Sequence, residues 1–284
     1  MKLMQGKNVL VTGSSRGIGF ETALGLAKLG AHVIIVSHDQ EHCAEAVAKI
    51  RSAAGEDAAR YYTADLASQE AIRVLAAEIK TGYTHLDVLV NNVGGWFRKY
   101  QESPDGIELT FALNHLSYFL LTGLLLDLLK ASAPARIVNV SSDAHRQADR
   151  IHFENIGFKG EYTTMKAYAQ SKLANILFTH ELARRLEGTG VTVNALHPGF
   201  VNSHLYRNFG LLEPLVRLFA GIGGKSIEEG AKTSIYVASS PALNLVSGKY
   251  FADEELVRSS EASFDQYTAE RLWELSEELT GLTY

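Results

Sequence analysis

The stretch Asn8-Val9-Leu10-Val11-Thr12-Gly13-Ser14-Ser15-Arg16-Gly17-Ile18-Gly19 predicts how the chain begins to fold. Residues 7–12 are typical of a short buried strand, a glycine turn follows, and residues 20–29 are typical of a helix that ends at Gly30. Strand, tight glycine turn and helix are the context of a dinucleotide-binding loop. The glycines let the backbone approach a pyrophosphate, which the helix N-terminus attracts. Alone, the turn fits an ordinary strand–helix connection equally well.

The same alternation of short apolar runs and helical patterns continues to the end of the chain. Further strands are predicted at residues 31–37, 60–64, 86–90, 135–140, 191–196 and 248–252. Helices are predicted at residues 40–54, from about 68, and at 108–129, 164–186, 226–239 and 264–279. Six or seven strands alternating with helices predict an α/β fold: one Rossmann-type, doubly wound parallel sheet with helices on both faces. We see no repeat or linker, so residues 1–284 are expected to form a single domain.

The composition excludes several classes of protein. Of the 284 residues 46% are hydrophobic, enough to fill a large core, and the net charge of −5 is scattered without a basic stripe, which argues against nucleic acid. Cys43 is the only cysteine, which favours a reducing compartment, and we expect the cytoplasm. Residues 118–129, the longest apolar run, are too short for a membrane span and contain Asp127. No apolar signal segment precedes the first strand.

The end of the second strand is where a dinucleotide-binding chain selects its cofactor. An acid there would bind the adenosine ribose 2′-OH and repel a 2′-phosphate. This chain has Ser37-His38, with no acid before Asp39, and Arg16 in the glycine loop is placed to meet a phosphate. The pattern favours NADP(H), and NAD(H) is the alternative that Asp39 leaves open. His38 and His42 lie four residues apart without a third ligand, so we expect no metal site.

Polar residues also follow the third and fourth strands. Asp65-Leu66 ends the third strand, where the carboxylate either accepts from an adenine amino group or caps the next helix. Asn91, Val93 and Gly94 end the fourth, where amides and glycines suit both a cofactor wall and a tight turn.

Tyr168 and Lys172 are the pair most suggestive of chemistry. They are four residues apart in a helical pattern and therefore share one face. A fixed ammonium lowers the pKa of a phenol from its usual value of about 10, so such a tyrosine exchanges a proton with a carbonyl oxygen or an alcohol near neutral pH. Ser142 follows the fifth strand, where open α/β sheets place their sites, and Asn114 lies within an apolar helix. Alone, Asn114 also fits a simple hydrogen bond in the core, and the Tyr–Lys spacing fits a solvated helix.

In their order along the chain, these motifs resemble the short-chain dehydrogenase/reductase family over nearly the whole sequence. They are Thr12-Gly13-x-x-x-Gly17-Ile18-Gly19, Asp65-Leu66, Asn91-Asn92-Val93-Gly94, Asn114, Ser142, Tyr168-x-x-x-Lys172 and Pro198-Gly199. Val93 departs from the alanine usual in the family. Several stretches resemble the retinol dehydrogenase branch, namely residues 114–116, 136–142, 171–178, 197–199, 247–251 and 271–274. The N-terminal membrane anchor of many such enzymes is not expected here.

The resemblance implies a role for each matching residue. Tyr168 would be the general acid/base, Lys172 would bind the nicotinamide ribose and tune Tyr168, Ser142 rather than Ser141 would hold the substrate oxygen, and Asn114 would hold a water. The implied cofactor-binding residues are Gly13, Ser15, Arg16, Gly17, Ile18, Gly19, Ser37, His38, Asp65, Leu66, Asn91, Val93, Gly94, Tyr168, Lys172, Pro198, Gly199, Val201 and Ser203.

These roles predict an NADP(H)-dependent oxidoreductase that interconverts a lipophilic aldehyde or ketone and its alcohol. Residues 204–225, rich in apolar and aromatic side chains, are expected to form a substrate lid. The alternatives are a sensor or scaffold that binds the cofactor without turnover, and a reductase of carbon–carbon double bonds. The helices at 108–129 and 164–186 resemble the dimer-forming helices of the family and equally fit a monomer, so the chain is expected to be a monomer or homodimer.

Overall fold

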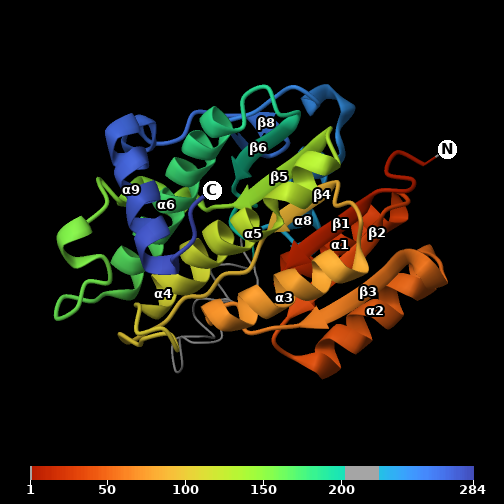
Figure 1. Cartoon of the computed structure of the whole chain (residues 1–284), viewed down its shortest axis with the longest axis horizontal. Helices are drawn as coiled ribbons and strands as arrows, with labels where there is room; N and C mark the ends of the chain where they lie inside the picture. Colours follow the sequence, from red (N-terminus) through yellow and green to blue (C-terminus); the bar gives the residue numbers. More distant parts are fainter. Residues whose placement is uncertain (1, 202–223) are drawn as a thin grey trace.

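The computed structural model describes residues 2–201 and 224–284. At its centre the described residues form an eight-stranded sheet in the order β3-β2-β1-β4-β5-β6-β7-β8 (Figure 1). The strands are β1 (Asn8–Thr12), β2 (His32–Ser37), β3 (Ala59–Thr63), β4 (Val88–Asn91), β5 (Ala135–Val140), β6 (Val191–Leu196), β7 (Lys249–Ala252) and β8 (Glu255–Leu256). Strands β1 to β7 are parallel, as predicted.

The predicted strand number was wrong by one. Strand β8 adds two exposed residues antiparallel to β7 at the edge of the sheet. A two-residue strand is too short to give the alternating or continuous apolar pattern by which strands are recognised in a sequence.

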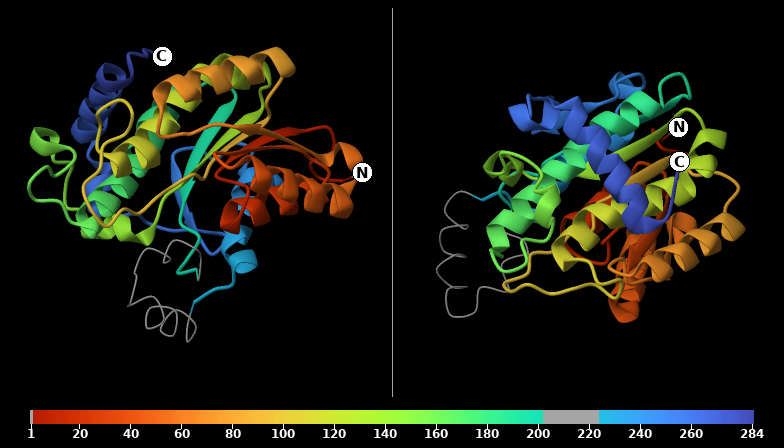
Figure 2. Two further views of the ribbon diagram at one scale, coloured as in Figure 1. Left: turned by 90° about the horizontal axis from the view of Figure 1, so that it is seen from below. Right: turned by 60° about the vertical axis from the view of Figure 1, so that its left-hand side comes forward.

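Helices cover both faces of the sheet, as Figures 1 and 2 show. They are α1 (Gly17–Lys28), α2 (Gln40–Ala54), α3 (Gln69–Gly82), α4 (Leu109–Phe111), α5 (Ser117–Ala131), α6 (Thr164–Arg185), α8 (Ile227–Ser239) and α9 (Gln266–Thr280). Successive strand residues point to opposite faces, so Leu10 and Val9 belong to different core clusters. The first cluster packs under α3, α5 and α6, and the second under α1, α2 and α8. Strands buried on both faces explain their continuous apolar runs.

The order of the strands sets where a ligand can bind. Strand β1 pairs with β2 on one side and with β4 on the other, so the chain changes direction across the sheet at this point. In open parallel sheets the crevice at the carboxyl ends of two such strands is the usual ligand site.

One long helical stretch carries an irregular turn. A π-helical turn at Ala112–Leu116 joins α4 to α5, and π-turns of this kind are frequent at functional sites. The combined stretch Leu109–Ala131 has 23 residues and a mean hydropathy of 1.5 in its most apolar window, so by length and composition it could cross a membrane. The prediction that no apolar segment is long enough was therefore wrong on that criterion. Burial explains the composition, because 78% of the window lies inside the protein.

The last helix, α9, packs against α6. Trp273 of α9 is almost fully buried against Phe119, Phe178 and Tyr284, and the Arg185 guanidinium lies 4.1 Å from its ring centroid. The chain thus places its own C-terminal helix against one of the two helices proposed for dimerisation.

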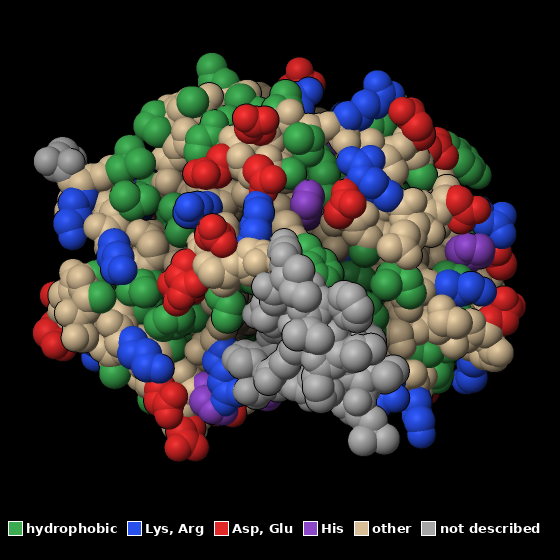
Figure 3. Space-filling model, turned by 180° about the vertical axis from the view of Figure 1, so that it is seen from behind, with side chains coloured by type: hydrophobic (Ala, Val, Ile, Leu, Met, Phe, Trp, Pro, Cys, Tyr) green, Lys and Arg blue, Asp and Glu red, His purple; other side chains and the backbone are tan. Residues whose placement is uncertain are grey.

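On the face shown in Figure 3, acidic and basic side chains are mixed rather than gathered into one patch.

Replacing Trp273 with Ala should lower the free energy of unfolding by about 3–5 kcal/mol, because it empties a large buried site. Tyr267, on the same helix, is 71% exposed, and Tyr267→Ala should change that free energy by no more than about 0.5 kcal/mol. Urea denaturation of both variants measures the difference. Equal losses would mean that α9 does not pack as described.

Candidate active site

The glycine loop brings backbone against backbone at the carboxyl end of β1. A Cβ atom on Gly19 would lie 2.4 Å from the carbonyl oxygen of Gly13 and 2.5 Å from Asn92 Nδ2, so no larger residue fits there. Gly17 has φ +61°, and a Cβ there would meet nothing within 4 Å. Gly19 therefore lets α1 pack close to β1, and Gly17 leaves open space above the turn.

The N-terminus of α1 is ready to receive an anion. Arg16 is its N-cap residue, and no side chain caps the helix. By contrast α2, α3, α6, α8 and α9 are each capped by an Asp, Ser or Thr side chain. The first N–H groups of α1 consequently lack a side-chain acceptor, which suits a phosphate. Ser15 Oγ donates to Ser37 Oγ at 3.0 Å and ties the loop to the end of β2.

The two adjacent asparagines at the end of β4 point to opposite sides. Asn92 Nδ2 donates to the carbonyl oxygens of Thr12 and Gly13 at 2.8 and 3.2 Å, so it locks the loop to β4. Asn91 is fully buried, and its Nδ2 donates to Thr122 and Asn139 in the core. The implied cofactor-binding residues include Asn91 but not Asn92, whereas the cavity is lined by Asn92 and not by Asn91. The pleat of β4 decides which of the two faces the crevice, and no signal in the sequence distinguishes them.

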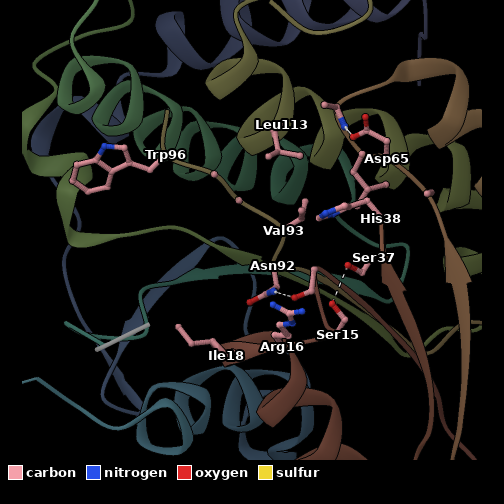
Figure 4. Close-up of a pocket in the computed structure, with 18 of the residues that line it drawn as sticks. Ser15, Arg16, Ile18, Ser37, His38, Asp65, Asn92, Val93, Trp96 and Leu113 are labelled. Carbon is pink, nitrogen blue, oxygen red and sulfur yellow. Dashed lines mark hydrogen bonds between the residues drawn. The ribbon is translucent and has the colours of Figure 1, made fainter. Parts of the chain in front are cut away.

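A cavity of about 660 Å³ opens at this edge of the sheet (Figure 4). It brings together twelve of the predicted cofactor residues: Gly13, Ser15, Arg16, Gly17, Ile18, Gly19, Ser37, His38, Asp65, Leu66, Val93 and Gly94. It is also lined by Asn92 and by the apolar side chains Trp96, Phe97, Leu109 and Leu113. The volume lies within the usual range for cofactor sites.

The two acidic residues near this cavity, Asp39 and Asp65, each accept a hydrogen bond from a backbone N–H group. The Asp39 carboxylate accepts the backbone N–H of His42 at 3.0 Å and pairs with its ring, and this backbone hydrogen bond is the main cause that lowers the pKa of Asp39. Asp39 therefore caps α2, and it does not line the cavity, whereas Ser37 and His38 do. Asp65 lines the cavity and accepts the N–H of Ala67 at 2.9 Å, while Ser68 caps α3.

Lys172 and Asn114 lie where the cavity reaches Gly94. A Cβ atom on Gly94 would be 3.5 Å from Lys172 Nζ and 3.4 Å from Asn114 Oδ1. Lys172 is 3% exposed, its Nζ donates to the carbonyl oxygen of Val140 at 3.0 Å, and burial lowers its pKa to about 7. Nζ also lies 5.6 Å from the ring centroid of Tyr168, so the pair shares one face of α6 as predicted.

Asn114 is held by the protein on both ends of its amide. Its Oδ1 accepts the N–H of Gly95 at 2.7 Å, and its Nδ2 donates to Gly95 O and Ser171 Oγ, each at 3.0 Å. The residue is fully buried in the π-turn. Asn114 is therefore both a core asparagine with all its hydrogen bonds made and a residue beside the site. Its role in holding a water stays a prediction.

The two serines after β5 have different surroundings. Ser141 is buried, and its Oγ donates to the carbonyl oxygen of Lys172 at 2.7 Å. Ser142 is half-buried, and its Oγ accepts the N–H of Ala144 at 3.2 Å, which leaves the hydroxyl proton free to donate. Of the two serines, Ser142 therefore keeps a hydroxyl proton that it can donate to a ligand, and its role toward the substrate oxygen stays a prediction.

Trp96 is the neighbour of Tyr168 that sequence reasoning missed. Their rings stack at 5.3 Å with an interplanar angle of 26°. The only signal in the sequence is the aromatic pair Trp96-Phe97 directly after two glycines, a pattern that is also typical of an ordinary loop. Beyond β6, Val201 is buried, and its Cγ2 would lie 2.5 Å from a Cβ atom on Gly230 of α8, with Ile18 close by. Ser203 and most of the predicted lid lie outside the described residues.

Comparisons with known proteins agree with this geometry. The sequence profile of the short chain dehydrogenase family matches residues 7–211. The chain belongs to this family. Human retinol dehydrogenase 14 is 44% identical over 301 residues, covering 99% of this chain and 88% of that protein. Family membership makes the chain an oxidoreductase of alcohols and carbonyl compounds that uses a nicotinamide cofactor.

Two solved structures have a similar fold. An uncharacterized protein from Mycobacterium paratuberculosis has a TM-score of 0.80 at 32% identity, covering 99% of this chain and 96% of that one. Pseudomonas aeruginosa RhlG, solved as an active-site complex with NADP, has a TM-score of 0.69 at 32% identity, covering 87% and 94%.

Replacing Lys172 with Met should stabilise the protein in the absence of cofactor. Burial lowers the pKa of Lys172 to about 7, so folding opposes its charge. This cost is complete below pH 7 and vanishes as the pH rises through the unfolded value of about 10.4. Val140 O would still accept the Tyr118 hydroxyl at 3.3 Å. The variant should gain on the order of 3 kcal/mol at pH 6.5 and much less at pH 9.5, measured by denaturant unfolding. A difference independent of pH would contradict the buried ammonium.

Proposed function

We propose that this dehydrogenase is NADP(H)-dependent and interconverts a lipophilic aldehyde or ketone with its alcohol, with Tyr168 as general acid/base. One observation carries the proposal: the cavity reaches Gly94, where Lys172 Nζ and the Asn114 amide lie, and Lys172 adjoins the Tyr168 ring. Phenol, amine and amide thus meet at the end of the cavity where the reactive ring of a dinucleotide would lie.

The residues present fit a dinucleotide along the whole cavity. The open space above Gly17 and the uncapped N-terminus of α1 suit the pyrophosphate, and the end of β2 suits the adenosine half. A side chain on Gly94 would fill the space facing Lys172, so glycine leaves room there for the nicotinamide half. When bound, the cofactor supplies or accepts the hydride, and the protein supplies position and the proton.

Each polar side chain then has one task. The Tyr168 hydroxyl gives its proton to the carbonyl oxygen, or takes one from the alcohol. Ser142 Oγ donates to the same oxygen and fixes its position. Lys172, with its pKa lowered to about 7, exchanges between ammonium and amine near neutral pH and can pass a proton toward Tyr168. Asn114 holds the backbone at Gly95 beside them.

The preference for NADP(H) rests on the rim of the cavity. The Asp39 carboxylate, the acid that would disfavour a 2′-phosphate, is engaged in capping α2. Arg16 is exposed and lines the cavity together with Ser37 and His38, so a cation faces the space beside the adenosine ribose. The RhlG structure that this chain resembles contains NADP.

The lipophilic substrate is supported by the apolar wall next to Tyr168. Trp96 stacks on the phenol, and Phe97, Leu109 and Leu113 line the cavity beyond it. Human retinol dehydrogenase 14, a relative, is named for an apolar alcohol. The presence of Asn114, Ser142, Tyr168 and Lys172 together disfavours a sensor without turnover, because a protein that only binds the cofactor has no need of this set. A carbon–carbon double-bond reductase remains the enzymatic alternative, which a carbonyl panel tests.

Turnover of carbonyl compounds should depend on the Tyr168 hydroxyl. With retinal, medium-chain aldehydes and ketones, Tyr168→Phe should lower kcat by about 100-fold to 10,000-fold, because it removes the proton donor. NADPH binding, followed by fluorescence, should change little. NADPH oxidation measured at 340 nm gives the rates. Activity that survives in the variant would refute the assignment, and binding without turnover by the wild type would favour a sensor.

The discrimination between cofactors should depend on Arg16. Arg16→Gln should lower kcat/KM for NADPH by about tenfold or more and leave that for NADH nearly unchanged, because one charge-assisted contact to the 2′-phosphate is lost. Lys28→Gln makes the same charge change at the other end of α1 and should alter neither value. A parallel loss with both cofactors would show that Arg16 supports the loop rather than the 2′-phosphate.

A further inference from the structure

Directly after Ser142 the chain makes a short helical turn, Asp143–Gln147, that packs against α6. His145 of this turn is fully buried and folds back toward the residue that precedes the turn. Its Nδ1 lies 2.7 Å from the carbonyl oxygen of Ser142, and its backbone N–H donates to the same oxygen at 3.1 Å. Two donors from one residue therefore hold the Ser142 carbonyl.

The other ring nitrogen fixes the proton of His145. The backbone N–H of Ser260 donates to His145 Nε2 at 3.0 Å, so Nε2 is an acceptor without a proton. The remaining proton must lie on Nδ1, where it is donated to the Ser142 carbonyl. Burial lowers the pKa of His145, which keeps the ring in this neutral form. A single tautomer thus connects Ser142 to the segment before α9.

The sheet also contacts the His145 ring. Tyr250 of β7 is buried and meets the His145 ring edge to face at 5.1 Å. Tyr250 in turn stacks on His197 at 5.9 Å, and His197 Nδ1 accepts the N–H of Gly199 at 3.0 Å. Packed side chains therefore run from Ser142 to the Pro198–Gly199 turn, which was predicted to contact the cofactor.

We propose that His145 is a positioning residue that sets the direction of the Ser142 hydroxyl through its Nδ1–H bond to the Ser142 carbonyl. This proposal rests on the proposed function, in which Ser142 holds the substrate oxygen. Ser142 is extended, with φ −158° and ψ 153°, and its Oγ already accepts the N–H of Ala144. With the carbonyl clamped and Oγ accepting, the remaining hydroxyl proton is the one directed to the substrate. Loss of the Nδ1–H bond leaves the backbone N–H of His145 as the only His145 donor to this carbonyl, which loosens the peptide and misaligns the hydroxyl.

The two hydrogen bonds of His145 can be removed separately. Asn can place an amide N–H near the position of Nδ1, so His145→Asn retains the bond to Ser142 and loses the acceptor for Ser260. Gln can place its amide oxygen near Nε2, so His145→Gln retains the bond from Ser260 and loses the donor to Ser142. Each variant removes one of the two ring hydrogen bonds of His145, so thermal unfolding should show similar losses of stability.

The test is NADPH-dependent carbonyl reduction by the full chain, in the wild-type and in a Ser142→Ala background. We expect His145→Gln to lower kcat by about tenfold and His145→Asn to stay within about twofold, with the Kd of NADPH unchanged in both. In the Ser142→Ala background neither substitution should lower kcat further, because the hydroxyl that His145 positions is gone.

Three results would overturn the proposal. Equal losses of kcat in the two variants would indicate a structural role alone. A loss in His145→Gln that persists in the Ser142→Ala background would show that His145 acts on something other than Ser142. An unchanged kcat in His145→Gln would show that the clamp is not needed. Failure of the proposed function itself looks different, because then wild type would show no turnover or Ser142→Ala would not reduce it.

Discussion

The burial of one ammonium group organises the region around the candidate site. Lys172 is 3% exposed, and desolvation of a charge inside a protein is costly unless partners surround it. Its Nζ donates to Val140 O, its own carbonyl accepts from Ser141, and Tyr118 of α5 donates to that same Val140 oxygen. The end of β5, the middle of α6 and the start of α5 are therefore tied to a single lysine. Burial lowers the pKa of Lys172 to about 7, so these contacts do not fully offset the desolvation of its charge.

The second constraint is the close approach of loop and strand at the other half of the cavity. Gly19 can lie against the Gly13 carbonyl only without a side chain, and Asn92 fills the remaining gap by donating to two backbone oxygens. Thr12 Oγ1 completes the lock by accepting the N–H groups of Asn92 and Val93. The adjacent ends of β1 and β4 thus become a rigid floor, and the N-terminus of α1 is left open above it.

Between these halves lies the π-turn of the long helix. The long helix is apolar because it is buried against the sheet. Its π-turn places the Asn114 amide against the backbone of Gly95. A regular helix would present side chains at uniform 100° steps, and inserting one residue per turn shifts them out of that register. The same helix therefore supplies part of the core and one wall of the site.

Local patterns in the sequence predict seven of the eight described strands and most of the residues that line the cavity. The periodicity of apolar residues predicted β1 to β7, the glycine spacing predicted the loop, and the separation of four residues placed Tyr168 and Lys172 on one face, because all three are local properties of the backbone. Two features depend instead on how distant segments pack: Asn92 rather than Asn91 faces the cavity, and Trp96 covers Tyr168. The pleat of the strands and contacts between distant segments determine these two features. Neither produces a periodic pattern in the sequence from which they could be predicted. The bond from Ser260 to His145, 115 positions apart, belongs to the same class.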